Sequence, residues 1–184
     1  MIMNIGFDLD KVLISYPPLV PGRMIDKLYK KKANGVLLYR IPSTPEQWLR
    51  KLSHIPALRR PIRENLHVLE ELSRKDHKLY LISSRFKFLE PETTKLVKKH
   101  GIDRLFDGLY FNYDNLQPHE FKNAVIKKLH LDIYVDDDLH LLNYVSRQQN
   151  GIRFYWLSDD KKAVSPNKKI QKIARLSDLF PHPS

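Results

Sequence analysis

Carboxylates follow two apolar stretches of the sequence, at positions where strands of a sheet are expected to end. Asp8 and Asp10 follow an apolar run near the N-terminus, and Asp136, Asp137 and Asp138 follow a second run further along the chain. Acidic side chains at the end of a buried strand are costly unless a cation compensates their charge. Because ligands bind beyond the carboxyl ends of strands in open parallel sheets, we expect both groups to face one crevice. Oxygen ligands without His or Cys favour Mg²⁺ over zinc, so the sequence predicts a magnesium site there.

Side chains suited to binding phosphate stand in two further places. Ser83, Ser84 and Arg85 follow the apolar run 78–83, where hydroxyl groups can donate hydrogen bonds to phosphate oxygens. Lys122 stands at the start of a stretch with helical spacing, where an ammonium group could neutralise a carboxylate and a phosphoryl group. The alternatives are plain turn residues for the two serines, a solvated surface position for Lys122, and a surface ion pair for Arg85.

Together these four places resemble the motifs of the haloacid dehalogenase-like (HAD) superfamily of phosphohydrolases. The first motif, DxDx(T/V), is matched by residues 8–12, the second by Ser83, the third by Lys122, and the fourth by Asp136 and Asp137. The motifs occur in the family's order and span the whole chain. The chain looks most like the deoxyribonucleotidase-type branch, whose members carry a small C1-type cap.

The resemblance implies a Mg²⁺-dependent phosphomonoesterase that works through an aspartyl-phosphate. Asp8 would attack phosphorus, and Asp10 would protonate the leaving oxygen and then activate water. The remaining implied roles are phosphate binding by Ser83, Ser84 and Lys122, Mg²⁺ binding by Asp8, the carbonyl of Asp10 and Asp136 or Asp137, and substrate contacts by Lys11 and Arg85.

Two features of the motifs depart from the family pattern or leave a choice open. Lys11 stands where many members have glycine, at a turn that favours a flexible residue. The three consecutive aspartates leave open which pair binds the metal. We favour Asp136 and Asp137, because Asp136 follows the strand most directly.

Strands and helices are expected to alternate along the chain and so to position these residues. Five apolar runs have the length of strands, at 2–8, 78–83, 108–112, 132–136 and 152–157. Helical spacing occurs at 61–75, 92–100, 121–129 and 139–149. The alternation predicts a doubly wound, mostly parallel five-stranded sheet. Residues 159–172 are polar and basic, which predicts a loop that leads into a last helix.

A basic insertion separates the first strand from the rest of this core. Residues 15–60 are too many for a loop and predict a small, mainly helical cap, with helices at 24–33 and 45–53 and an extended piece at 36–41. The core is then residues 1–14 and 61–184. Residues 21–60 hold ten Lys and Arg against two acidic residues, a net charge of +8. Such a charge suits an anionic ligand such as a nucleotide, a polyphosphorylated metabolite or a nucleic-acid end, although a solvated helix face is the simpler alternative.

Composition narrows the remaining classes of protein. The 184 residues carry a net charge of +11, are 42% hydrophobic and include no cysteine, which fits a globular protein without disulfides, zinc thiolates or a cysteine nucleophile. No apolar run is long enough to span a membrane, and the N-terminus lacks the features of a signal peptide, so we expect a soluble cytoplasmic protein. The alternative to a phosphatase is a HAD-like module that binds nucleic acid through its basic cap. The oligomeric state is left open.

Overall fold

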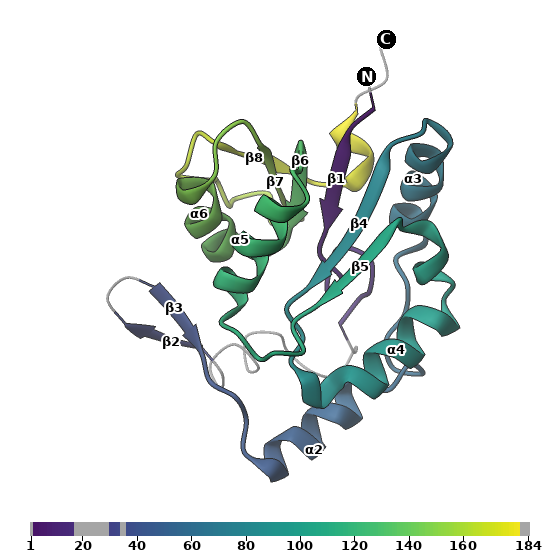
Figure 1. Ribbon diagram of the computed structural model, residues 1–184, viewed down its shortest axis with the longest axis vertical. Coiled ribbons are helices and arrows are strands. Elements are labelled where there is room, and N and C mark those ends of the chain that lie inside the picture. The colour runs from purple at the N-terminus through teal and green to yellow at the C-terminus, as the bar shows by residue number, and fades with distance from the viewer. Residues whose placement is uncertain (1, 17–29, 34–35, 181–184) are drawn as a thin grey trace.

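The computed structural model describes residues 2–16, 30–33 and 36–180, and a parallel sheet lies at their centre (Figure 1). The sheet has six strands in the spatial order β5-β4-β1-β6-β7-β8, and every neighbouring pair is parallel. The strands are β1 (Asn4–Phe7), β4 (Lys78–Ser83), β5 (Gly108–Phe111), β6 (Ile133–Asp136), β7 (Arg153–Leu157) and β8 (Ile170–Ile173). The predicted α/β class and parallel sheet are confirmed.

Helices cover both faces of this sheet, because parallel neighbours must be joined by crossover connections. One face packs against α3 (Arg63–Arg74), α4 (Glu90–Lys99) and the 3₁₀ segments η2 (Ile102–Leu105) and η3 (Leu176–Leu179). The other face packs against α5 (Pro118–Lys128) and α6 (Leu139–Gln148). A further 3₁₀ segment, η1 (Lys87–Leu89), precedes α4. Within the described residues, no helix combines the length and apolarity needed to cross a bilayer.

Strand β1 shows how the two faces are built. Ile5 and Phe7 are fully buried in the cluster on the α3 side, and Gly6 between them faces the opposite cluster. A Cβ atom on Gly6 would lie 2.5 Å from Cδ1 of Leu131 and 3.0 Å from Cδ2 of Tyr134. Only a residue without a side chain therefore allows β1 to pack this closely against the segment that leads into β6.

The sheet has six strands rather than the five predicted. Strand β8, at Ile170–Ile173, falls where the sequence predicted a loop followed by a helix, and it pairs in parallel with β7. Its two apolar residues, Ile170 and Ile173, are three positions apart, which is the spacing of a helix rather than of a strand. The short 3₁₀ segment η3 is the helical structure that follows. Pairing with the buried strand β7 outweighs this local pattern.

The described part of the insertion 15–60, which is the predicted cap, contains a hairpin and one helix. Strands β2 (Lys30–Ala33) and β3 (Val36–Tyr39) pair antiparallel, and α2 (Thr44–Ser53) follows them. Residues 24–29 of the predicted helix 24–33 lie outside the described residues, and its last four residues form β2 instead of helix. The lysine run favours a helix locally, but pairing with the apolar strand β3 decides otherwise. The predicted helix 45–53 corresponds to α2, and the predicted extended piece to β3.

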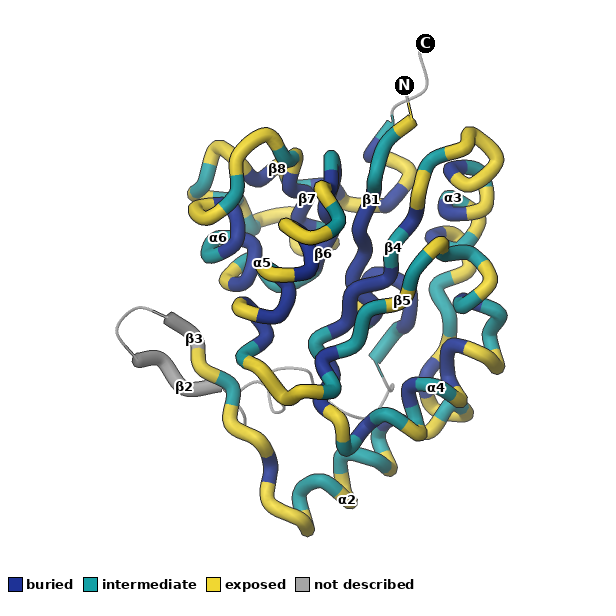
Figure 2. Tube along the Cα trace, viewed as in Figure 1, coloured by how far each residue is buried: buried dark blue, intermediate teal, exposed yellow. Residues whose placement is uncertain are grey.

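Helix α2 begins clearly but buries little. The side chain of Glu46 accepts a hydrogen bond of 2.7 Å from the backbone N–H of Ser43, and Pro45 occupies the first turn. All ten residues of α2 are described, and none is buried. Figure 2 shows the contrast with the dark blue strands of the core. Helix α2 is therefore attached to the core over a small area.

Candidate active site

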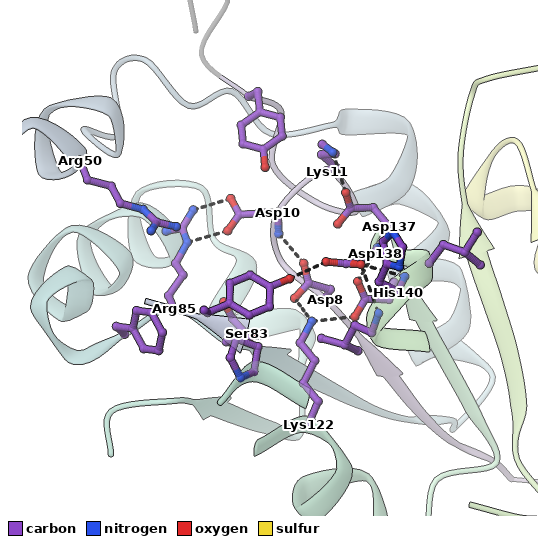
Figure 3. A pocket seen from close by; sticks show the side chains of 18 residues that line it. Asp8, Asp10, Lys11, Arg50, Ser83, Arg85, Lys122, Asp137, Asp138 and His140 are labelled. Carbon is purple, nitrogen blue, oxygen red and sulfur yellow. Dashed lines mark hydrogen bonds and ion pairs between the residues drawn. The ribbon is translucent and has the colours of Figure 1, made fainter. Parts of the chain in front are cut away.

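A pocket of about 300 Å³ lies at the carboxyl ends of β1, β4 and β6, where the sequence places its motifs (Figure 3). Parallel pairing brings these strand ends to one edge of the sheet, and the backbone N–H of Asp8 donates a 3.0 Å hydrogen bond to the carbonyl of Val135. The pocket is lined by core residues together with Tyr16, Tyr39 and Arg50 from the insertion. All nine residues predicted for the site line this pocket.

Lys122 links two carboxylates at the floor of this pocket. Its Nζ donates hydrogen bonds of 2.7 Å to Oδ1 of Asp8 and 2.6 Å to Oδ2 of Asp136. The hydroxyl of Tyr134 donates a further 2.8 Å hydrogen bond to the same oxygen of Asp136. All four residues are buried, with Lys122 only 2% exposed. The alternative of a solvated surface position for Lys122 is wrong.

Burial and charge act in opposite directions on these groups. Burial raises the pKa of the Asp8 carboxyl to about 7, against the opposing effect of the Lys122 ammonium. For Lys122 burial alone would lower the pKa, but the carboxylates of Asp136 and Asp8 outweigh burial and raise its pKa well above the usual value. Lys122 therefore keeps its proton and its positive charge at neutral pH.

Three acidic side chains gather beside this ammonium group. One carboxylate oxygen each from Asp8, Asp136 and Asp137 lies within 4.8 Å of the other two. Asp137 also forms an ion pair of 2.8 Å with Nζ of Lys11. Burial raises the pKa of Asp137 to about 6, although Lys11 opposes the shift and Asp136 adds to it. Burial is the main cause of both raised pKa values, the neighbouring carboxylates add to it, and a bound cation would favour the charged forms.

Asp138 has a different role from its two neighbours. Its Oδ1 accepts hydrogen bonds from the backbone N–H groups of His140 (2.9 Å) and Leu141 (3.2 Å), which caps helix α6. Its Oδ2 accepts a 2.7 Å hydrogen bond from the hydroxyl of Tyr39. The group within 4.8 Å contains Asp136 and Asp137, which is the pair that the sequence favoured.

The donor set fits a magnesium ion. All three side chains offer hard carboxylate oxygens, and Mg²⁺ is typically held by few carboxylates together with water and phosphate oxygens. The side chain of Asp10 does not belong to this group of three carboxylates. The metal ligand expected from Asp10 was its backbone carbonyl. Metal binding by these residues stays a prediction.

The carboxylate of Asp10 is held by two arginines. Nε and Nη2 of Arg85 donate hydrogen bonds of 2.8 and 2.7 Å to its two oxygens, and Nη2 of Arg59 also donates to Oδ1. Arg85 completes its contacts with a 3.2 Å hydrogen bond to Oγ1 of Thr93. The backbone N–H of Asp10 points the other way and donates to Oδ2 of Asp8 at 3.0 Å. Arg85 is only 6% exposed, so the alternative of a surface ion pair for Arg85 is wrong.

Lys11 occupies the turn between the two motif aspartates and the cap. Its φ of 59° lies in the left-handed region of the Ramachandran plot, which favours glycine. Its Nζ lies 4.9 Å from the centre of the Tyr16 ring in addition to its ion pair with Asp137. Lys11 therefore lines the pocket, as expected for a substrate contact, but it also contacts a predicted metal ligand.

Ser83 and Ser84 stand at the end of β4, and both line the pocket. Ser83 is almost fully buried, and Figure 3 shows it between Arg85 and Lys122. This position is consistent with binding a phosphoryl oxygen between two cationic side chains.

Several residues of the site were missed by the sequence analysis. The backbone N–H of Tyr39 donates to Oε1 of Gln117 at 2.9 Å, and Nε2 of Gln117 donates back to the carbonyl of Tyr39 at 3.2 Å. With its hydroxyl on Asp138, Tyr39 thus connects the cap to two parts of the core. In the sequence, Arg50 and Arg59 contribute only to the positive charge of the insertion. Charge alone does not predict which side chains point into the pocket.

The protein resembles known proteins in structure and not in sequence. The sequence matches no protein-family profile and no curated protein. A haloacid dehalogenase-like hydrolase from Bacteroides fragilis has a similar structure, with a TM-score of 0.66 and 15% sequence identity over 98% of this chain and 100% of that chain. A HAD-superfamily hydrolase from Ehrlichia chaffeensis matches with a TM-score of 0.57 and 13% identity over 97% of this chain and 95% of that chain.

A third similar structure was solved with ligands. It is a HAD family enzyme from Bacteroides thetaiotaomicron in complex with magnesium and inorganic phosphate, with a TM-score of 0.56 and 14% identity over 88% of this chain and 96% of that chain. At these low identities the likeness concerns the fold. The chain therefore has the fold of HAD-superfamily hydrolases.

Proposed function

We propose that this protein is a Mg²⁺-dependent phosphomonoesterase of the HAD type. The observation that carries the proposal is the cluster in which Lys122 bridges Asp8 and Asp136 while Asp137 stands within 4.8 Å. Hydrolysis of a phosphomonoester needs a nucleophile, a cation beside it and donors for the phosphoryl oxygens, and these residues supply each of them. The HAD fold supports the proposal independently.

In the first step a carboxylate oxygen of Asp8 attacks phosphorus. The P–O bond to the leaving alcohol breaks, and its electron pair stays on the leaving oxygen, which takes a proton from Asp10. Ser83 and Lys122 hold the phosphoryl oxygens while charge redistributes. In the second step Asp10 takes a proton from water, and the resulting hydroxide attacks phosphorus and restores Asp8. Asp8, Asp136 and Asp137 would hold Mg²⁺, which would supply positive charge that shields the attacking carboxylate from the anionic phosphate.

The substrate class follows from the size and charge of the pocket. A volume of about 300 Å³ suits a small phosphorylated molecule, and the basic insertion favours one with several negative charges, such as a nucleotide. The three clustered carboxylates favour catalysis over a module that only binds nucleic acid, because a site for polyanions alone gains nothing from them.

A phosphatase screen tests this function. Release of inorganic phosphate is measured from nucleotides, sugar phosphates and 3′- or 5′-phosphorylated oligonucleotides, with Mg²⁺ and with EDTA, and Asp8→Asn serves as the blank. We expect Mg²⁺-dependent release from at least one class by the wild-type protein only. Equal inactivity of both proteins on every class, together with oligonucleotide binding by both, would establish the binding module instead.

A further inference from the structure

The pocket has two ends of opposite charge. The acidic end consists of Asp8, Asp136 and Asp137, whereas Arg50 and Arg85 line the opposite end. Figure 3 shows Arg50 extending from the cap helix α2 into the pocket, toward Arg85 and Asp10. A substrate whose phosphate reaches Asp8 can therefore place its far end beside these two arginines, one from the core and one from the insertion.

Among the described residues, Arg59 and Arg85 are two buried cations beside the single carboxylate of Asp10. Arg59 is 1% exposed, and among the described residues its Nε and Nη1 have no hydrogen-bond partner. Burial lowers the pKa of Arg59 to about 9, and the neighbouring charge of Arg85 lowers it further in the same direction. Burial also lowers the pKa of the nearby His54 well below its usual value, so His54 is neutral and adds no charge. Within the described part of the chain, two buried guanidinium groups thus share one carboxylate.

Asp10 shows which kind of group this end recognises. Arg85 holds it through two parallel N–H···O contacts of 2.8 and 2.7 Å, the arrangement in which a guanidinium group binds any carboxylate or phosphate. Asp10 is also the residue to which the proposed function gives the proton transfers. The same side chain is therefore needed at two places, the arginines and the leaving oxygen.

We propose that Arg85 and Arg50 bind a second anionic group of the substrate, a carboxylate or a phosphate, and that Asp10 occupies this site until the substrate replaces it. This inference rests on the proposed function. The substrate anion takes over the two contacts to Arg85, and Asp10, which keeps a single contact to Arg59, is then able to turn toward the leaving oxygen. A second anion thus improves both binding and turnover, and the substrate class narrows to small phosphomonoesters that carry another negative group.

Binding is tested with matched ligands on the Asp8→Asn protein, which retains bound ester. Isothermal titration calorimetry in Mg²⁺ compares 2-hydroxyethyl phosphate with phosphoglycolate, which has a carboxylate in place of the alcohol, and with 1,3-propanediol bisphosphate. We expect at least one of the two doubly anionic ligands to bind tenfold or more tightly than 2-hydroxyethyl phosphate. The better of the two identifies a carboxylate or a phosphate site, and equal affinity of all three overturns the inference.

Variants of two neighbouring cations assign the preference to the arginine end. Arg50→Gln should reduce the ratio of affinities at least threefold, and Arg50→Lys, which keeps the charge, should retain part of it. Lys51→Gln removes a charge from the same helix at a residue that does not line the pocket, and it should leave the ratio unchanged. If Arg50→Gln and Lys51→Gln alter the ratio equally, general charge attraction explains the preference and the inference fails.

Turnover separates this inference from the proposed function. Wild-type kcat should be higher for the preferred doubly anionic ester than for 2-hydroxyethyl phosphate, because the second anion releases Asp10. Hydrolysis of all three esters with equal kcat and KM leaves the phosphatase intact but rejects the second anion site. Tight, Arg50-dependent binding without hydrolysis of any ester rejects the phosphatase but supports the site.

Discussion

Helices α2 and α6 have similar sequence patterns but very different surroundings. Both have an apolar and a polar side, yet Leu142 and Val145 of α6 are fully buried while Trp48 and Leu49 of α2 are 65% and 63% exposed. Helix α6 packs on the sheet and carries Asp138 at its N-terminus, whereas the insertion contacts the core through polar groups of Tyr39 and Arg59. The core end of the pocket is therefore held by packing, and the cap end by a few hydrogen bonds.

The largest expected effect is the loss of Lys122 at the core end. Lys122→Ala leaves the buried carboxylates of Asp8 and Asp136 without their shared cation, so we expect a loss of about 3–5 kcal/mol in the free energy of unfolding. Denaturant unfolding without Mg²⁺ measures it. Lys127→Ala, at an exposed position of the same helix, should change stability by less than about 0.5 kcal/mol. Similar values for the two variants would contradict the buried network.

Two leucine truncations compare the helices directly. Leu142→Ala should cost about 2–5 kcal/mol because it leaves a cavity in the core, whereas Leu49→Ala should cost about 0.5 kcal/mol or less. Chemical denaturation of both variants measures the difference. If Leu49→Ala were as costly as Leu142→Ala, the apolar side of α2 would be covered in solution.

The acidic end should make stability depend on pH and on Mg²⁺. Because the pKa values of Asp8 and Asp137 are raised to about 7 and about 6, the native protein keeps protons that the unfolded chain loses above about pH 4. The free energy of unfolding should therefore fall as pH rises from about 4 to 7 in EDTA. Mg²⁺ binds the deprotonated carboxylates, so it should raise Tm more at pH 7.5 than at pH 5.

Matched variants assign this Mg²⁺ effect to the cluster. Asp137→Asn should reduce the increase in Tm at pH 7.5, and Asp114→Asn, at an exposed position outside the group within 4.8 Å, should leave it unchanged. An increase in Tm that is the same at both pH values, or the same in both variants, would show that Mg²⁺ acts elsewhere.

The smallest effect is expected where the cap meets the core. Tyr39→Phe removes the hydrogen bond to Asp138 but leaves the two contacts between the Tyr39 backbone and Gln117, so a loss of about 1 kcal/mol is expected. Hydrogen exchange should show faster exchange at the cap amides and unchanged protection in β1 and β6. Faster exchange throughout the sheet would mean that cap and core unfold together.

Much of the core could be predicted because its signals are local. The five predicted strands all occur, since each is a short apolar run bounded by polar residues, and the motif residues follow these runs directly. Strand β8 was missed because Ile170 and Ile173 have the spacing of a helix. The predicted helix at 24–33 failed at its described end because pairing of Lys30–Ala33 with β3 outweighs the preference of a lysine run.

The sequence by itself determined the fold class and the acids, serine and lysine that gather at one edge of the sheet. Alternation of apolar runs fixes the strands, and parallel strands bring their carboxyl ends together whatever the loops do. Only the tertiary structure decided the partners: Arg59 meets Asp10 across 49 positions, and Tyr39 meets Asp138 across 99. The sequence shows which side chains carry opposite charges and can attract one another. Which of the 32 basic residues reaches a given carboxylate depends on how the rest of the chain packs.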